Sequence, residues 1–210
     1  RNKEHSIASR LGECVVGHCE VIRLNCDAMS KPQETTGRKA FKDWFDKAAA
    51  RQLAAQVATA SPKFDQTKFV RLATKKLSDL EFAGRVQLFS DSLAATLPAA
   101  VPKALDVLIK SLPDPLPDCE QVTDGWLQWP IGQFIADHGL DYFDASMTAM
   151  IDLTKRFTSE FAVRPFIEHH PDRTIKRLFK LTNDSNPHVR RWCSEARRRY
   201  RRIRGVRRGP

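Results

Sequence analysis

The sequence predicts an all-α protein made of antiparallel helical pairs with short connections. Apolar residues recur at steps of three and four along most of the chain, which is the period of an amphipathic helix. Only 9 Gly and 2 Tyr occur among 210 residues, a composition that disfavours a many-turned β sandwich. No segment alternates apolar and polar residues as a half-buried strand does. With 41% hydrophobic and 29% charged residues, the chain can bury a core.

Helical segments follow one another from residue 41 onward. The first begins with the aromatic residues Phe41, Trp44 and Phe45 and stops at Ser61-Pro62. Prolines at 113, 115 and 117 form a loop, because Pro disrupts a helix interior. Gly139 is a plausible helix C-cap. The expected helical segments are 41–60, 64–77, 80–97, 99–112, 126–138, 141–157, 160–169, 172–181 and 186 onward.

The two ends of the chain differ from this helical body. Residues 1–38 show no sustained helical period, and the first Met is Met29. We interpret residues 1–38 as a flexible or non-native leader; a genuine short N-terminal extension is the alternative. Residues 39–195 form the predicted helical repeat domain, and residues 196–210 form an Arg-rich tail.

The net charge of +10 is distributed unevenly. The tail carries eight Arg and no acid, residues 1–28 are neutral in sum, and residues 29–195 have a net charge of only +2. An argument for a polyanionic partner must therefore rest on where the cations lie. The tail itself predicts salt-sensitive, sequence-independent attraction to DNA. We expect residues 198–210 to be an unpacked or frayed helical extension.

Several site classes are disfavoured by the sequence. No stretch approaches 18 uncharged apolar residues, and no apolar segment near the start indicates secretion. The odd number of five Cys favours a reduced, cytoplasmic setting. Neither His169, His170 and Asp172 nor the irregularly spaced Cys14, His18, Cys19 and Cys26 match a known metal-ligand spacing. We predict no metal, no cofactor and no membrane partner.

Two stretches of the sequence echo each other at a spacing of 26 residues. Residues 159–166, SEFAVRPF, align with residues 185–192, SNPHVRRW. Both have Ser first, Val-Arg four and five residues later, and an aromatic residue at the end. Asp184, Asn186 and Pro187 supply the chemistry of a helix N-terminus. A turn followed by a helix with Val-Arg in its first turns is typical of HEAT-type repeats, although their usual period is longer.

The chain resembles a known protein family in three longer stretches. These are WP, QFIADHGLDYF and ASM between residues 129 and 147, LTKRFTSEFAVRPF at 153–166, and NPHVRR with SE between 186 and 195. Together they resemble the bacterial DNA alkylation repair glycosylases of the AlkC type, and the resemblance covers about residues 41–195. It implies a curved solenoid of HEAT-like repeats whose concave face grips duplex DNA. It also implies hydrolysis of the N-glycosidic bond of cationic alkylated bases such as 3-methyladenine.

The resemblance ends after Glu195. Members of the family continue there with Gly-Thr-Arg-Pro-Arg-Leu-Pro-Trp and further repeats, whereas this chain becomes Arg-rich. We therefore expect a C-terminally shortened or frameshifted copy that acts as a monomer on double-stranded DNA containing alkylated bases. The alternative is a catalytically inactive HEAT-like scaffold that binds DNA or protein.

Glu160 is the candidate catalytic residue. The resemblance places it at the essential Glu of the family. Breaking an N-glycosidic bond builds positive charge on the sugar, and an alkylated base that is already cationic needs no general acid to leave. One carboxylate could then suffice. If the backbone is helical, Arg156 and Arg164 would flank this carboxylate; an ordinary exposed helix ion pair is the alternative.

The other candidate site residues are mostly cations. Lys155, Arg156, Arg164, Arg190 and Arg191 are candidate phosphate contacts, although the Arg of a Val-Arg pair in HEAT-type repeats often packs within the array. Glu195 could lie on the lesion side of the cleft or be a solvated helix carboxylate. Trp126 and Trp129 could each stack on DNA. Core packing is the alternative that we favour for both, and more strongly for Trp126 than for Trp129.

Overall fold

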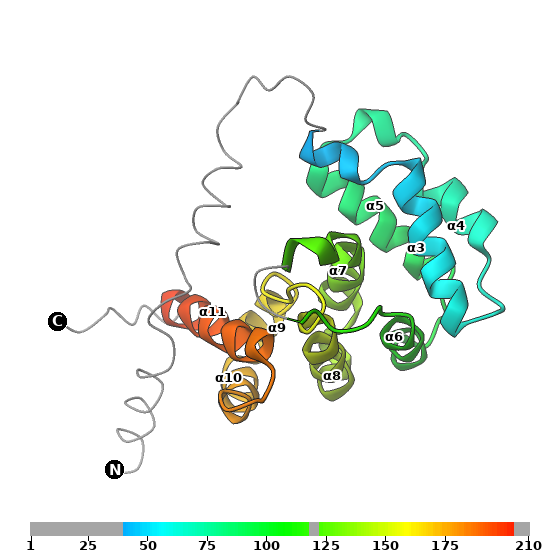
Figure 1. Ribbon diagram of the computed structural model, residues 1–210. Coiled ribbons are helices and arrows are strands. Elements are labelled where there is room, and N and C mark those ends of the chain that lie inside the picture. Colours follow the sequence, from blue (N-terminus) through cyan, green and yellow to red (C-terminus); the bar gives the residue numbers. More distant parts are fainter. Residues whose placement is uncertain (1–39, 118–121, 204–210) are drawn as a thin grey trace, which may run out of the picture. The chain divides into compact units, whose positions relative to one another are not determined.

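The described part of the chain, residues 40–117 and 122–203 of a computed structural model, has helices as its regular elements and no strand (Figure 1). These residues belong to one unit, which begins at Ala40. The predicted all-α class is confirmed. The leader 1–38 with its Cys and His residues, and Arg204, Arg207 and Arg208 of the tail, lie outside the described residues. No described helix is both long and apolar enough to cross a membrane.

The first predicted helix is divided at Asp46. This residue is extended, and its carboxylate accepts a hydrogen bond of 2.9 Å from the backbone N–H of Ala49, so it caps a new helix. Asp65 caps the next helix in the same way, at 2.8 Å from the N–H of Lys68. The elements here are η1 (Phe41–Trp44), α3 (Lys47–Ala60), α4 (Gln66–Ala73), η2 (Leu77–Asp79) and α5 (Phe82–Ala94).

The middle of the chain follows the expected order. Residues 112–117 are a loop without helix, as the prolines predicted. Gly139 is the C-cap of α7, but its φ of −88° is not left-handed. Gly is needed there because a Cβ would collide with the side chain of Ser146 and the carbonyl of Ile135. The elements are α6 (Val101–Lys110), η3 (Val122–Gln128), α7 (Trp129–His138), η4 (Leu140–Tyr142) and α8 (Phe143–Thr154).

Three helices complete the unit and lie against one another: α9 (Arg164–His169), α10 (Pro171–Lys180) and α11 (Pro187–Ile203) (Figure 1). The predicted capping chemistry of α11 is confirmed, because Asn186 Oδ1 accepts hydrogen bonds from the N–H groups of His188 and Val189 at 3.0 and 3.4 Å. The aligned positions of the two echoing stretches have similar burial. Val163 and Val189, and likewise Phe166 and Trp192, are fully buried.

The start of the Arg-rich tail is part of α11. The helix continues past residue 195, and Ala196 is buried in the core. Arg199 forms an ion pair of 2.9 Å with Glu168 of α9, and Tyr200 packs against the core. The expectation of an unpacked extension is therefore wrong for these two residues, because α9 and α10 offer a surface that covers them.

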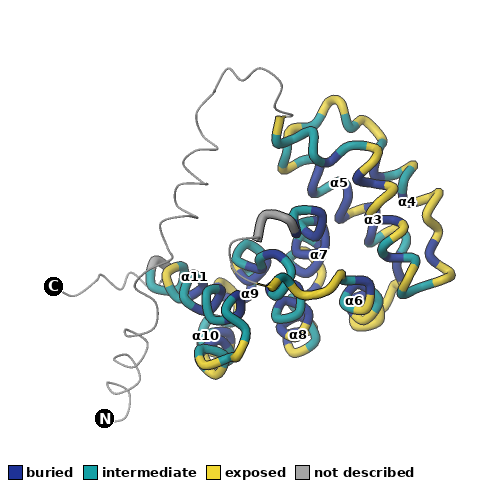
Figure 2. The backbone as a smooth tube through the Cα atoms, viewed as in Figure 1, coloured by how far each residue is buried: buried dark blue, intermediate teal, exposed yellow. Residues whose placement is uncertain are grey.

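The core lies between two series of helices. In one series α4, α5, α7, α9 and α11 are neighbours, and in the other α3 contacts α6 and α6 contacts α8. Figure 2 shows buried positions as recurring dark blue stretches along the helices, with exposed positions between them. This periodic burial is what the three- and four-residue spacing of apolar residues predicted. The contact between α9 and α11 brings together the segments that carry the candidate site.

Candidate active site

The turn before α9 holds the backbone of Glu160 in place. The buried Ser159 donates its hydroxyl to the carbonyl of Met150 at 2.8 Å. The N–H of Glu160 donates to Thr158 Oγ1 at 3.3 Å, and the N–H of Val163 donates to the carbonyl of Ser159 at 3.0 Å. Because Ser159 and Val163 are fully buried, the backbone that carries the Glu160 side chain is fixed.

An ion pair with Arg191 fixes the carboxylate of Glu160. Arg191 lies on α11, and its Nη1 donates to Glu160 Oε1 at 2.6 Å. The exposed fractions of the two side chains are 14% for Arg191 and 26% for Glu160. Nε and Nη2 of Arg191 are buried without a hydrogen-bond partner among the described residues. The guanidinium is therefore committed to one oxygen of Glu160, while the carboxylate stays partly accessible.

Arg156 and Arg164 do not flank Glu160 as a continuous helix would place them. Helix α9 begins only at Arg164, so Glu160 lies in the preceding turn. Pro165 explains this start, because its ring would clash with the preceding turn of a continuous helix. Arg156 donates to the backbone carbonyls of Pro113 and Asp152 instead. Burial lowers the pKa of Arg156, and the nearby Asp152 and Asp114 oppose that shift. Arg164 is exposed, and its guanidinium has no hydrogen-bond or ion-pair partner among the described residues.

The remaining polar candidates have local partners. Lys155 pairs with Asp152 at 3.0 Å, so it belongs to the end of α8. Arg190 donates to the carbonyls of Asp184 and Ser185, both at 2.8 Å, and thus ties α11 to the loop before it. For Arg190, the Arg of the second Val-Arg pair, these contacts agree with the alternative of packing within the helical array. Glu195 lies one turn along α11 from Arg191 and pairs with Arg198 at 3.2 Å.

Trp129 belongs to an aromatic cluster beside the turn. Its ring stacks on Phe161, the residue after Glu160, with centroids 5.4 Å apart and planes at 26°. Phe82 and Phe157 approach the same ring at 4.8 and 5.2 Å. Gly132 faces Phe161, where a Cβ would collide with the ring. Trp129 thus supports the position of Phe161 and is only partly accessible.

Trp126 packs into the same part of the core. Its ring lies 5.5 Å from Trp44 and 5.2 Å from Phe45, both in edge-to-face geometry. Such pairs add stabilisation beyond the area that they bury. The core interpretation of Trp126 agrees with these contacts.

The candidate site presents one carboxylate, that of Glu160, to a possible substrate. Glu160 combines a fixed backbone, a cationic partner and a partly accessible oxygen, and such a group can stabilise developing positive charge on a substrate. Among residues 40–117 and 122–203, no three His, Cys, Asp or Glu side chains gather as metal ligands would. A carboxylate in this setting can act electrostatically or as an acid or base.

Comparison with known proteins identifies the relatives of this chain. No protein-family model matches it. A solved structure, that of Pseudomonas fluorescens alkylpurine DNA glycosylase AlkC bound to DNA containing an abasic site analog, matches with a TM-score of 0.65 and 28% sequence identity. The chain resembles an AlkC-type glycosylase in sequence and fold. The match covers 74% of this chain and 41% of the AlkC chain.

A second relative is a protein without an assigned function. The uncharacterized protein YhaZ of Bacillus subtilis (strain 168) is 30% identical over 161 residues, which are 75% of this chain and 42% of YhaZ. This chain thus spans about two fifths of the length of each relative. The resemblance inferred from the sequence motifs is confirmed.

Sequence reasoning identified Glu160 but not its partner. Arg191 was singled out as a phosphate contact, whereas the structure turns it toward Glu160, 31 residues earlier. No local spacing rule connects the two, because the contact depends on α11 packing against α9. Ser159 and Thr158 were also missed as residues that fix the turn. Their place next to the candidate Glu in a turn was the available signal.

Proposed function

We propose that this chain is a DNA glycosylase that hydrolyses the N-glycosidic bond of cationic alkylated bases, such as 3-methyladenine, in double-stranded DNA. Glu160 is the proposed catalytic carboxylate. The observation that carries the proposal is the fixed, partly accessible Glu160 held by Arg191 in a chain that is similar to AlkC. We further propose that it acts as a monomer and without a metal or cofactor.

The proposed reaction needs one negative charge near the sugar. When the C1′–N bond breaks, its electron pair moves onto the cationic base, which leaves as a neutral molecule. The sugar becomes an oxocarbenium-like cation, which the carboxylate of Glu160 stabilises. A water oxygen then bonds to C1′ and gives one proton to Glu160, from which solvent takes it. The products are a free base and an abasic site.

Arg191 and the turn position this carboxylate. A charge that is already oriented before the reaction costs no reorganisation when the transition state forms. The ion pair uses Glu160 Oε1, and Oε2 has no partner among the described residues, so we assign Oε2 to the sugar or the water. Phe161 and Trp129 support the neighbouring backbone by stacking.

The proposed DNA contacts differ in what supports them. Arg164 is exposed and unpaired among the described residues, so it is the candidate with a free guanidinium near the turn. The other candidate cations, Lys155, Arg156 and Arg190, already donate hydrogen bonds within the chain. Each would have to donate to a phosphate in addition to its present acceptor. We assign Arg164 to a phosphate next to the lesion, and Glu195 to the lesion side.

Base release from defined duplexes tests the proposal. The substrates are duplexes with N3-methyladenine or N7-methylguanine, which are cationic, and with O6-methylguanine or uracil, which are neutral. We expect enzyme-dependent release of free base from the cationic set only, because Glu160 supplies no proton to a neutral leaving group. The no-enzyme rate is subtracted, since cationic bases also leave spontaneously. Absence of release from every duplex would refute the proposal and favour the scaffold alternative.

A further inference from the structure

The segment that contains α3 and α4 has few acids to offset its cations. Residues 47–76 carry seven Lys and Arg and one acid, Asp65, for a net charge of +6. Residues 29–195 as a whole have a net charge of only +2, so the rest of that span is net −4. Asp65 uses its carboxylate to cap α4. The segment is therefore strongly basic, whereas the rest of residues 29–195 is acidic in sum.

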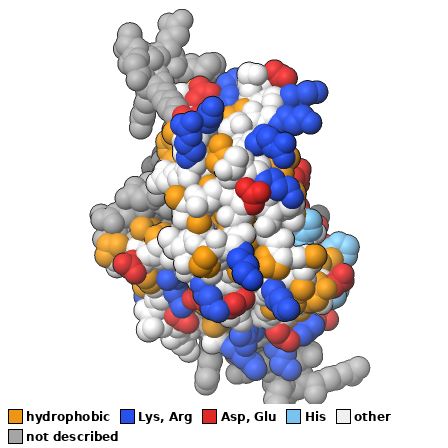
Figure 3. Space-filling view, turned by 90° about the vertical axis from the view of Figure 1, so that its right-hand side faces the viewer, with side chains coloured by type: hydrophobic (Ala, Val, Ile, Leu, Met, Phe, Trp, Pro, Cys, Tyr) orange, Lys and Arg blue, Asp and Glu red, His pale blue; other side chains and the backbone are white. Residues whose placement is uncertain are grey.

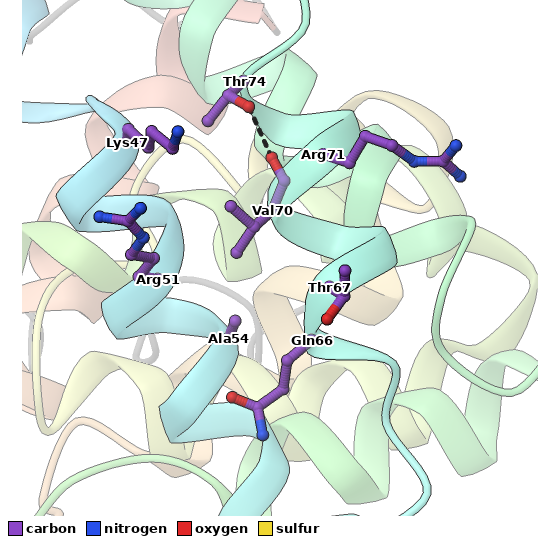
Figure 4. Close-up of a pocket in the computed structure, with 8 residues that line it drawn as sticks. All are labelled: Lys47, Arg51, Ala54, Gln66, Thr67, Val70, Arg71 and Thr74. Atoms are coloured by element: carbon purple, nitrogen blue, oxygen red, sulfur yellow. Dashed lines mark hydrogen bonds between the residues drawn. The ribbon is translucent and has the colours of Figure 1, made fainter.

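An open hollow lies between these two helices. Its volume is about 540 Å³, and its lining includes Lys47 and Arg51 of α3 and Gln66, Thr67, Arg71 and Thr74 on the α4 side, with no acid. Figure 4 shows the side chains of Lys47 and Arg51 next to each other on α3, whereas the guanidinium of Arg71 points away from α3. Lys47, Arg51 and Arg71 are exposed and have no hydrogen bond or ion pair among the described residues.

The surface around the hollow is basic as well. Figure 3 shows Lys and Arg side chains in the upper part of the face that is turned to the right in Figure 1, and a second group of them in its lower part. Lys47 and Arg51 are four residues apart, so they share one face of α3 about 6 Å apart along its axis. Like charges at this spacing repel each other, which disfavours the arrangement unless an anion relieves it.

We propose that the hollow between α3 and α4 binds phosphates of a DNA duplex, with Lys47 and Arg51 as the principal contacts. Small-molecule pockets are mostly apolar, whereas this hollow is open and lined mainly by cations, hydroxyls and an amide. Those are the groups that contact DNA phosphates. The choice of DNA as the polyanion rests on the proposed function, but this surface is separate from the Glu160 turn in the sequence and carries none of its residues.

The salt dependence of DNA binding tests the inference. The variant K47A/R51A is compared with K176A/K180A, which removes two exposed, unpaired cations at the same four-residue spacing on α10. Both pairs are helical and exposed, and Ala is the best helix former, so neither variant should unfold. Binding of a fluorescent, lesion-free duplex is measured by anisotropy over a range of NaCl concentrations. Circular dichroism of each protein checks the fold.

We expect K47A/R51A to flatten the plot of log affinity against log salt by about 1.8, or about 0.9 for each lost phosphate contact. The control pair should change the slope by much less. Equal changes in both variants would indicate an effect of net charge alone and overturn the inference. An unchanged slope in K47A/R51A would overturn it too, and so would weaker binding of single-stranded RNA with duplex binding unaffected.

The result is separable from the proposed catalysis. If K47A/R51A has a flatter salt slope than the wild type, but the wild type releases no methylated base, the phosphate surface stands and the proposed function fails. If the wild type releases base but the slope difference is missing, the phosphate surface fails alone. A wild type that binds no duplex would overturn both.

Discussion

Replacing Arg191 by Met removes the partner of Glu160 while keeping a side chain of similar length. The lost contact is a 2.6 Å charge-assisted hydrogen bond between side chains that are 14% and 26% exposed. Such bonds contribute about 1.5–3 kcal/mol, and partial exposure reduces the value. Arg191 also buries two nitrogen atoms without a partner among the described residues, and each such donor costs about 1–3 kcal/mol. The two effects oppose each other, so we expect the stability of Arg191→Met to change by only about 1 kcal/mol in either direction.

The coupling between the two side chains is the sharper quantity. Urea unfolding of the wild type, Glu160→Gln, Arg191→Met and the double variant forms a double-mutant cycle. We expect a coupling energy of about 1 kcal/mol, because Gln keeps a neutral acceptor and loses only the charge. The exposed pair of Lys110 and Asp106, studied in the same way, should give about 0.3–0.5 kcal/mol.

A coupling energy for Glu160 and Arg191 below about 0.3 kcal/mol, which is within the error of additivity, would refute this reasoning. It would mean that the pair contributes no interaction in solution. The rate of base release offers a second check, because a carboxylate without its guanidinium is less well oriented. Arg191→Met should therefore lower the single-turnover rate even where its stability is unchanged.

Further predictions concern two glycines and a cysteine. Gly125→Ala should destabilise the fold by about 1–3 kcal/mol, since a Cβ there would collide with the backbone carbonyl of Arg156; Gly84→Ala, in a helix with only side-chain atoms nearby, should be neutral or stabilising in the same thermal melts. Burial raises the pKa of Cys193 from 9.0 to about 12. Between these pH values the unfolded chain loses a proton that the folded chain keeps, so the free energy of unfolding should fall as pH rises from 9.0 to 12. At pH 8, iodoacetamide followed by peptide mapping should label Cys193 only after unfolding in urea.

The helical order of the chain was predictable because burial follows the apolar period. Ser61, the proline loop at 112–117 and Asn186 marked boundaries that the structure keeps. The division of the first helix at Asp46 was not predicted, although Asp is a preferred N-cap, because the apolar period continues through it. The packing of Tyr200 against the core was not predicted, because it is a single aromatic residue in an Arg-rich stretch without an apolar period.

The candidate site was predictable only in part. The family resemblance pointed to Glu160 as a candidate. The flanking by Arg156 and Arg164 required a helical backbone there, whereas α9 begins only at Arg164. The actual partner of Glu160, Arg191, depends on the tertiary contact of α9 with α11. The basic region on α3 and α4 was overlooked for another reason: averaging charge over 29–195 cancels it against acids elsewhere, whereas a shorter window reveals the net +6.

Single-turnover base release by Glu160→Gln tests the central claim most directly. The substrate is duplex DNA with N3-methyladenine, and Glu168→Gln, at an exposed carboxylate of α9, is the matched control. The account predicts a drop of a hundredfold or more for Glu160→Gln, about 2.7 kcal/mol in the activation free energy, with DNA affinity and the rate of the control unchanged. Cleavage by Glu160→Gln at the wild-type rate would contradict it and leave Glu160 as only the structural partner of Arg191.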